Sequence, residues 1–529
     1  MSVYLPAMVV QKALGMGRII LFTYLVSRDQ MGVWSSGVML FILGAPLVSL
    51  GANHVMARYV SIYEARGQLE EFYRRSRFWV FLIVACITAI CFPGWEWIQS
   101  LLRRVNLASD LYVLRDANIR LAVAGNLALM ALYLAQISFM YGLRAYTLAA
   151  VMEVTFSVIF TAWGVAWVCV SPAALSLLLA HMGSLAVVMI VFLQLLGLAV
   201  RRIARQQAER EDLRETDVPV EPSAAAEGDA VGATIPLDTA KRFEGAPATP
   251  KGIEWLGILR YGLAGMVGTL IQYCSQNVSY FMVLHRYREV SAGSFWVMMQ
   301  FAQPLVFLGN AAWAVLFGHV ARLWESGNRN GAMFMLETAY KAIALTIMTF
   351  SVLLYTTSHW WIHILSPEYR HGFHYLSGLL TFFLTISNLT MLAIPASLHK
   401  KPIVIALGAL GGAIANGVLA ALWMPDWGEV GAARAAGVGM FFGGGFVMLI
   451  YLLVSKTRLS DSTYFVLGTP VLLLLPTHIV GALWAVILPV SVFSPWVFDD
   501  RQKTVLSGVI RKGLGDLKRF LTWTWNQSR

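Results

Sequence analysis

About fourteen long apolar segments fill this chain, and the Lys and Arg residues between them concentrate in alternate loops. Each segment has roughly 18 to 26 residues, enough for a helix rising 1.5 Å per residue to cross a hydrocarbon core of about 30 Å. Hydrophobic residues make up 58% of the 529 residues and charged residues only 13%, whereas about a quarter of a soluble domain is charged. The sequence therefore predicts an all-α polytopic membrane protein.

We predict about 14 transmembrane helices in this chain. They lie at residues 3–26, 33–56, 78–100, 117–140, 146–170, 172–199, 254–283, 292–318, 335–357, 374–398, 402–424, 431–455, 462–476 and 477–498. Around Pro476 the pattern fits either one long helix or two short ones. Two helices keep the number of spans even, and both termini then lie on the same side of the membrane.

The charges of the loops predict the orientation. The even-numbered loops and the C-terminal segment hold about 27 Lys and Arg residues, and the odd-numbered loops hold about 7. Because loops rich in Lys and Arg stay in the cytoplasm, we expect both termini to be cytoplasmic. The net charge of +11 then reflects attraction to an anionic inner leaflet, and a nucleic-acid partner is not required to explain it.

Two segments lie outside the predicted membrane helices. Residues 203–250 are rich in Pro, Ala, Gly, Ser and Thr without apolar periodicity, which is typical of a disordered linker. The C-terminal tail alternates apolar and basic residues at helical spacing, which predicts an amphipathic helix on the inner leaflet. The predicted organisation is an N-terminal six-helix lobe (1–200), a cytoplasmic linker (201–252), a C-terminal six-helix lobe (253–456), two additional transmembrane helices (457–499) and a cytoplasmic amphipathic tail (500–529).

An internal repeat indicates how the two lobes are related. PLVSLGAN at Pro46–Asn53 and PLVFLGN at Pro304–Asn310 each lie in the second predicted helix of their lobe. Six helices separate the copies, so both lobes start from the same side and should be related by a pseudo-two-fold axis along the membrane normal. Two such lobes facing each other are expected to form an alternating-access carrier.

The sequence also resembles a known family. Its first 77 residues, with DQMGVWSSG and VSLGANHVMARYV around the second predicted helix, resemble the start of the polysaccharide and oligosaccharide (O-antigen repeat type) flippases of the multidrug/oligosaccharidyl-lipid/polysaccharide exporter superfamily. The resemblance continues, in the same order, through LRYGLAGMVGTLIQ, VSAGSFWVMMQFAQPL, LSPEYR and HKKPIVIALGALGGAIANGVLAALWMPDWGEVGAARAAGVG. It implies a twelve-helix core with two extra helices.

The resemblance further implies a function at the bacterial inner membrane. Members of this family flip a lipid-linked oligosaccharide of the undecaprenyl-diphosphate type from the inner to the outer leaflet for surface polysaccharide synthesis. The expected partners are this cargo, membrane lipids, a coupling ion (proton or sodium), and a polysaccharide polymerase or glycosyltransferases. No cofactor is expected.

Charged residues deep in the first and fifth predicted helices indicate the cargo path. A charge at the centre of a lipid-facing helix costs roughly 2.5 to 3.5 kcal/mol, and Lys12, Arg18 and Glu153 lie too deep to reach water from a helix end. Gln11, Gly15 and Arg18 are spaced so that they share one helical face. We expect this face to point inward.

The seventh and eighth predicted helices supply the opposite wall. A polar stripe follows the seventh helix through Gly265, Thr269, Gln272, Gln276 and Ser279. The eighth helix continues it with Gln300, Gln303 and Asn310, beside Pro304. These polar groups either face a water-filled cavity or hold neighbouring helices together, as amides do in membrane bundles.

A cationic face suits an anionic cargo, because Arg forms bidentate hydrogen bonds with phosphate oxygens. Arg18, Lys12, Arg58 and Arg260 are the candidates for binding a diphosphate, with Arg58 and Arg260 at the cytoplasmic mouth. For these last two, a role in topology alone is the alternative.

The one acid placed deep in a span is Glu153. It either binds the coupling ion or pairs with Lys12, and exposure in the cytoplasmic half is the competing interpretation. Lys341, in contrast, lies near a helix end, and we expect its side chain to extend toward water.

Three other classes of function are alternatives to a flippase. An ion-coupled drug or metabolite exporter of the same superfamily would be expected to carry acids for cationic drugs, whereas this chain has one deep acid and several bases. A non-transporting scaffold is a further alternative. A membrane sugar polymerase or ligase usually needs a large extracytoplasmic loop, but the longest here, residues 101–116, holds no acid/base constellation. We therefore predict a protein that is not an enzyme. We expect no metal site either, because the histidines near Trp360 and Trp361 fit a membrane interface.

Overall fold

The computed structural model describes residues 4–91, 116–216 and 255–508, apart from residues 400, 402, 456 and 458, together with residue 511. This part of the chain is built from helices and contains no strand. Eight helical stretches within it are long and apolar enough to cross a membrane. The prediction of an all-α polytopic membrane protein is confirmed.

The predicted number of spans is a separate question. Two of the eight stretches, of 71 and 52 residues, each cover more than one predicted span. Two shorter apolar helices, Asp461–Leu474 and Thr477–Phe493, coincide with the last two predicted spans on either side of Pro476. The count of about 14 therefore stays a prediction.

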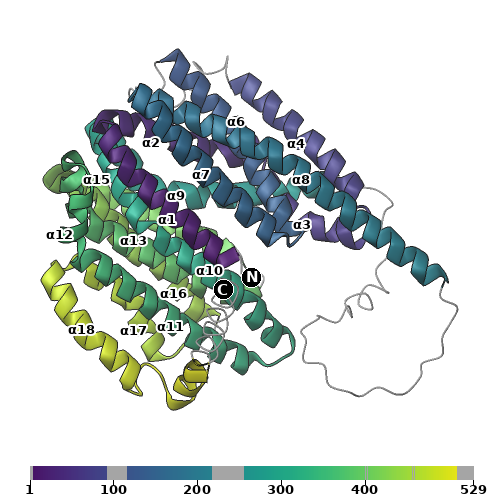
Figure 1. Cartoon of the computed structure of the whole chain (residues 1–529). Helices are drawn as coiled ribbons and strands as arrows, with labels where there is room; N and C mark the ends of the chain where they lie inside the picture. Colours follow the sequence, from purple (N-terminus) through teal and green to yellow (C-terminus); the bar gives the residue numbers. More distant parts are fainter. Residues whose placement is uncertain are drawn as a thin grey trace, which may run out of the picture.

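The N-terminal lobe is one helical bundle, purple to blue in Figure 1. Its helices are α1 (Tyr4–Leu25), α2 (Arg28–Val48), α3 (Ala52–Ala65), α4 (Leu69–Cys91), α6 (Ala117–Gly142), α7 (Tyr146–Val170) and α8 (Ala174–Thr216). α6 packs against α2, α3 and α8, and α7 packs between α1 and α8. α8 continues past residue 200, so the first part of the predicted linker is helical; the linker from residue 217 onward lies outside the described residues.

The C-terminal lobe follows in teal and green (Figure 1). Its main helices are α9 (Trp255–Ala302), α10 (Pro304–Glu325), α11 (Arg329–Thr356), α13 (Phe373–Leu392), α15 (Ile403–Gly439) and α16 (Gly445–Val454). Shorter elements join them: α12 (Ser358–Trp361), η3 (Ile362–Ile364), η4 (Pro367–Gly372), α14 (Ile394–Leu398) and η5 (Met440–Gly444). Non-helical backbone at Arg288 bends α9, and Gly428 bends α15, so each of these helices consists of two segments.

Two prolines of the repeat mark helix breaks. Pro46 lies in the last turn of α2, and the helix stops because Leu50 (φ 48°) and Gly51 (φ 73°) adopt left-handed backbone before α3 begins. Pro304 starts α10 directly after the end of α9. Residues 33–56 were predicted as one helix, and the structure corrects this to two helices. Proline has no amide hydrogen to donate to the helix, and this weakens the helix at both positions.

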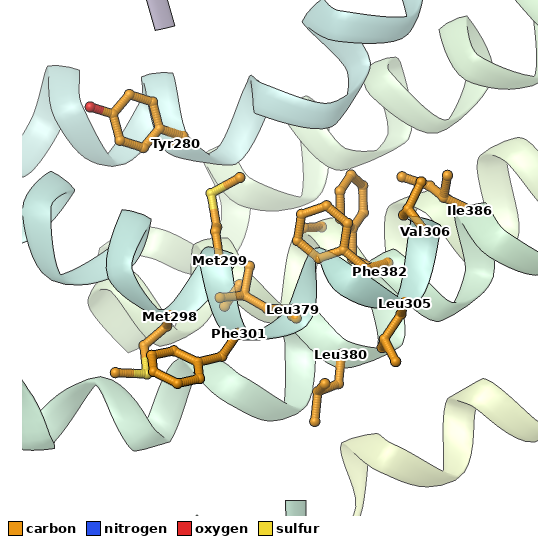
Figure 2. Close-up of a cluster of buried hydrophobic side chains, with 14 of the residues drawn as sticks. Tyr280, Met298, Met299, Phe301, Leu305, Val306, Leu379, Leu380, Phe382 and Ile386 are labelled. Atoms are coloured by element: carbon orange, nitrogen blue, oxygen red, sulfur yellow. The ribbon is translucent and has the colours of Figure 1, made fainter. Parts of the chain in front are cut away.

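The core of the C-terminal lobe surrounds the junction of α9 and α10. Figure 2 shows Met298, Met299 and Phe301 before the junction and Leu305 and Val306 after it. They pack with Leu379, Leu380, Phe382 and Ile386 of α13, which is buried over nearly its whole length. This packing fixes the direction in which α10 leaves the junction.

The extra C-terminal helices pack on the outside of this lobe. α17 (Asp461–Gly468), η6 (Thr469–Leu474) and α18 (Thr477–Phe493) contact α11, with α18 at the yellow outer edge of Figure 1. Lys341 of α11 is only 2% exposed, and its Nζ donates to the Val497 carbonyl oxygen at 3.1 Å. The expectation that Lys341 extends toward water is therefore wrong, because the chain after α18 covers it. Of the predicted tail, residues 500–508 and 511 are described, as helix, and the rest lies outside the described residues.

Candidate functional site

A cavity of about 580 Å³ lies between the two lobes. Helices α1, α2, α3, α6, α7 and α8 form one wall, and α9 and α10 form the other. Seven of the nine predicted cargo-binding residues line it: Gln11, Lys12, Arg18, Thr269, Gln272, Gln276 and Gln300. Gly15, Gln303 and Asn310 line it as well. The polar face of α1 and the polar stripe of α9 therefore face the same space.

Arg18 is the cation at the N-terminal wall. Its guanidinium carbon lies 4.4 Å from the centre of the Phe160 ring, a cation–π contact. Nη1 lies 3.5 Å from both the hydroxyl and the carbonyl oxygen of Ser157, the limit of hydrogen bonding. Nε is buried and has no partner among the residues that the structure describes. The guanidinium thus keeps hydrogen-bonding capacity for a ligand.

Lys12 reaches across the cavity toward the other lobe. Its Nζ lies 5.2 Å from the centre of the Phe307 ring in α10. Its charge and that of Glu153 in α7 interact, but no ion pair joins them among the described side chains. Instead, Glu153 Oε1 accepts a hydrogen bond from the Tyr141 hydroxyl at 3.1 Å. Glu153 is not among the residues that line the cavity.

The stripe on α9 divides into three parts. Thr269, Gln272 and Gln276 face the cavity, and the Thr269 hydroxyl lies 2.6 Å from His54 Nε2 of α3. Gly265 lies against the His54 ring, where a Cβ would be 2.6 Å from Cγ. Ser279 is buried inside the C-terminal lobe, donating to Asn416 Oδ1 and the Ala432 carbonyl. Different residues of this stripe therefore contact the N-terminal lobe, line the cavity and stabilise the C-terminal lobe.

Arg58 and Arg260 do not line the cavity. Both side chains are exposed, and the Arg58 guanidinium lies 4.6 Å from the centre of the Tyr261 ring. Arg58 of α3 thus contacts α9 outside the cavity wall. The structure separates these two residues from Arg18 and Lys12, which do line the cavity.

Several polar residues of the wall were not predicted from the sequence. His54, Asn53, Ser157 and His181 all line the cavity. His181 was detectable, since an isolated histidine in the apolar segment LLLAHMGSL is as unusual as a buried acid. His54 was not, because its role depends on a contact with the other lobe.

The lobes touch at both ends of the cavity. At one end, α2 and α9 approach so closely that a Cβ on Gly32 would overlap the Glu289 carbonyl. Arg28 Nε donates to Ser294 Oγ there at 2.9 Å. We call this the Gly32 contact. At the other end, which we call the Gly51 contact, a Cβ on Gly51 would overlap the Gly262 carbonyl. The left-handed backbone at Gly51 also favours glycine. The cavity thus lies between two close helix contacts.

The chemistry of the lining is one-sided. Two cations and several amides face the space, and no Asp or Glu is among its lining residues in the described chain. Such a wall stabilises negative charge and offers hydrogen bonds to a polar ligand.

Comparison with solved structures identifies the class of fold as that of the MOP-superfamily transporters. Lipid II flippase MurJ in an inward closed conformation superposes with a TM-score of 0.60 at 12% identity, covering 92% of this chain and 99% of MurJ. An inward-facing multidrug resistance MATE family transporter gives 0.57 at 14% identity, covering 85% of this chain and 96% of its own. A MOP superfamily transporter from Pyrococcus furiosus, described as having a binding pocket of reverse polarity, gives 0.52 at 15% identity, covering 85% and 92%. No protein-family profile and no curated protein matches the chain.

Proposed function

We propose that this protein is a flippase that moves a lipid-linked oligosaccharide of the undecaprenyl-diphosphate type from the inner to the outer leaflet. The oligosaccharide is used for surface polysaccharide synthesis, and a polymerase or glycosyltransferases act on it before or after it is flipped. The observation that carries the proposal is the cationic cavity between two lobes that touch at both of its ends. An alternating-access carrier requires such a space, with one contact opening at a time.

The charge of the cavity supports a diphosphate cargo. Arg18 keeps an unpartnered Nε and a loosely held Nη1, and an Arg fork matches two phosphate oxygens. Lys12 adds a second positive charge on the same helix. The amides Gln272, Gln276 and Gln300 can bind sugar hydroxyls. Arg58 and Arg260 are expected to act at the cytoplasmic mouth, where cargo would enter.

An ion-coupled drug or metabolite exporter is the second candidate, because one neighbour in fold is a multidrug resistance transporter. A cationic drug would require an acid in the cavity, and the described lining has none. Another neighbour in fold is a lipid II flippase. The charge of the wall favours the flippase.

The proposal includes an orientation and an energy source. Both termini lie in the cytoplasm and the protein spans the bacterial inner membrane, as the Lys and Arg loops predict. The Gly51 contact then faces the cytoplasm and the Gly32 contact the outside. Glu153 is the proposed site of the coupling ion, a proton or sodium, because a carboxylate within a span is rarely without function.

Replacing Arg18 tests the proposed cargo. In a strain that makes the polysaccharide, Arg18→Ala should abolish surface polysaccharide at an unchanged level of membrane protein. Arg18→Lys should restore part of it, because the charge remains and the bidentate geometry is lost. Arg202→Ala, an exposed cation far along α8, is the matched control. Full polysaccharide with Arg18→Ala would overturn the assignment.

A further inference from the structure

His181 of α8 lies on the cavity wall, and the proposed function gives it no role. Its ring packs among three phenylalanines, with centroid distances of 5.0 Å to Phe41, 5.2 Å to Phe156 and 4.9 Å to Phe160. The side chain is 8% exposed. A buried imidazole in such apolar surroundings needs a hydrogen-bond partner for each ring nitrogen.

Asn126 fixes the tautomer of this ring. Asn126 Nδ2 donates to two carbonyl oxygens, those of Ala122 at 2.8 Å and Leu178 at 2.9 Å, so the orientation of the amide is determined. Its Oδ1 is then an acceptor and lies 2.7 Å from His181 Nδ1. Nδ1 must carry the hydrogen, and in the neutral ring Nε2 is left as an acceptor. No described residue forms a hydrogen bond with Nε2.

Trp34 of α2 supplies the complementary group. Its ring centre lies 5.7 Å from that of His181, and it lines the same cavity. Although the side chain is only 3% exposed, the indole Nε1–H has no partner in the described chain. Buried indole N–H groups ordinarily find an acceptor. The wall therefore holds one unmatched donor and one unmatched acceptor within an aromatic surface.

We propose that Trp34 and His181 form a subsite for the acetamido group of a cargo sugar; the inference rests on the proposed function and extends it. An acetamido group has one carbonyl acceptor, one N–H donor and one methyl group. The Trp34 N–H donates to the carbonyl, His181 Nε2 accepts from the N–H, and the methyl group packs on the phenylalanine rings. A plain hydroxyl in the same position leaves the aromatic surface unfilled.

The position of Arg18 agrees with this arrangement. The Arg18 guanidinium and the His181 ring both lie on the Phe160 ring, at 4.4 Å and 4.9 Å from its centre. The phosphate-binding group and the acetamido subsite are thus neighbours on one wall. In a diphosphate-linked oligosaccharide the first sugar is bonded directly to the diphosphate, so the subsite recognises that first sugar.

Binding to the full-length protein in nanodiscs tests the proposal. The probes are undecaprenyl diphosphate N-acetylglucosamine, undecaprenyl diphosphate glucose and undecaprenyl diphosphate itself. The unmodified protein should bind the acetamido probe about tenfold more tightly than the glucose probe, as expected for two additional hydrogen bonds. His181→Phe should abolish the preference, and Trp34→Phe should reduce it at least threefold. All of these proteins should keep their affinity for undecaprenyl diphosphate.

Trp34→Phe is the cleaner variant, because Trp34 Nε1 makes no hydrogen bond within the described chain and the aromatic ring is kept. Its result decides the matter if His181→Phe does not fold, as judged by melting temperature. Trp167→Phe, on the outer face of α7 and 49% exposed, is the matched control. Equal affinity of the unmodified protein for both sugar probes, or an unchanged preference in both variants, would overturn the subsite.

Failure of the flippase proposal gives a different result. If Arg18→Ala leaves the affinity for undecaprenyl diphosphate unchanged, the phosphate assignment fails and the sugar preference is still measured. If no diphosphate probe binds at all, saturation-transfer NMR with free N-acetylglucosamine and glucose reports the subsite alone. A preference for the acetamido sugar that His181→Phe or Trp34→Phe removes supports the inference, and its absence overturns it.

Discussion

Polar residues of the cavity differ in whether their hydrogen-bonding groups have partners within the protein. Ser157, His54 and Thr269 have partners within the protein, whereas Gln11 Oε1 and Arg18 Nε are buried without one in the described chain. A buried polar group without a partner costs about 1 to 3 kcal/mol. A ligand or water that satisfies Gln11 and Arg18 recovers this cost. The unsatisfied groups thus mark where binding energy is available.

Glu153 carries the prediction on ion coupling. If its carboxylate binds the coupling ion, Glu153→Gln should keep cargo binding, because Arg18 and Lys12 are untouched, and should lose the dependence of transport on pH or sodium. If it serves Lys12 instead, the double variant Glu153→Gln with Lys12→Gln should recover function that the single variants lose. The measurement is the initial flipping rate in vesicles at several pH values and sodium concentrations. A Glu153→Gln protein with the rate and ion dependence of the parent contradicts both roles.

Whole elements meet through glycines where the lobes touch. The Gly32 contact brings α2 against the bend of α9, and the Gly51 contact brings the break between α2 and α3 against the first half of α9. Both contacts use backbone against backbone, which only residues without a Cβ allow. Side chains add to each contact, with Arg28 hydrogen-bonded to Ser294 beside Gly32 and His54 next to Thr269 beyond Gly51.

The Gly32 contact yields a prediction at this scale. Within a helix, Gly→Ala ordinarily stabilises by up to about 1 kcal/mol, but here the methyl group would overlap the Glu289 carbonyl. Gly32→Ala should therefore hold the lobes apart at that end and slow flipping at least tenfold. Gly268→Ala in α9 should leave the flipping rate nearly unchanged, because nothing lies within 4 Å of the added carbon. Spin labels on α2 and α9 should report a longer distance in Gly32→Ala alone; an unchanged distance and rate contradict the prediction.

The sequence predicted the elements better than the contacts between them. Apolar length and helical spacing were enough to place Gln11 and Arg18 on one inward face, since both properties belong to a single helix. The break between α2 and α3 was missed although Pro46 and Gly51 are sequence signals of a helix end, because the apolar run continues through PLVSLGAN. The contact of Gly51 with Gly262 could not be predicted, because it joins two lobes. The prediction for Lys341 was wrong because it also depends on a contact between segments. Its position near a helix end indicated exposure to water, but the segment around Val497 covers the side chain. The separation of Arg58 from Arg18 also depends on how the lobes meet.

The described part of the chain forms two lobes with extra helices on one side (Figure 1). The cavity of about 580 Å³ lies between the two lobes. MOP-superfamily transporters share this fold over most of the chain. The proposed cycle opens the Gly51 contact to the cytoplasm and the Gly32 contact to the outside in turn. The cavity residues of α1 and α9 then meet the cargo from both sides.

The orientation of the molecule is the prediction at this scale. In a variant without native cysteines, Ala230→Cys and Phe520→Cys should resist an impermeant thiol reagent in intact cells, because both segments are expected in the cytoplasm. Ala108→Cys, in the longest extracytoplasmic loop predicted, should react. Permeabilised cells provide the control, in which all three should react. Labelling of residue 230 from outside would reverse the orientation and the assignment of the two contacts.

Flipping by the purified protein is the most direct measurement of the central claim. The cargo is lipid-linked oligosaccharide extracted from the producing strain, tagged on its sugar with a fluorophore and reconstituted into vesicles with the protein. An impermeant quencher should reach only about half of the fluorophore in protein-free vesicles and nearly all of it with the unmodified protein. Arg18→Ala should resemble the protein-free vesicles. Quenching that stays at about half with the unmodified protein, while the same vesicles transport a cationic dye, would contradict the account and favour a drug exporter.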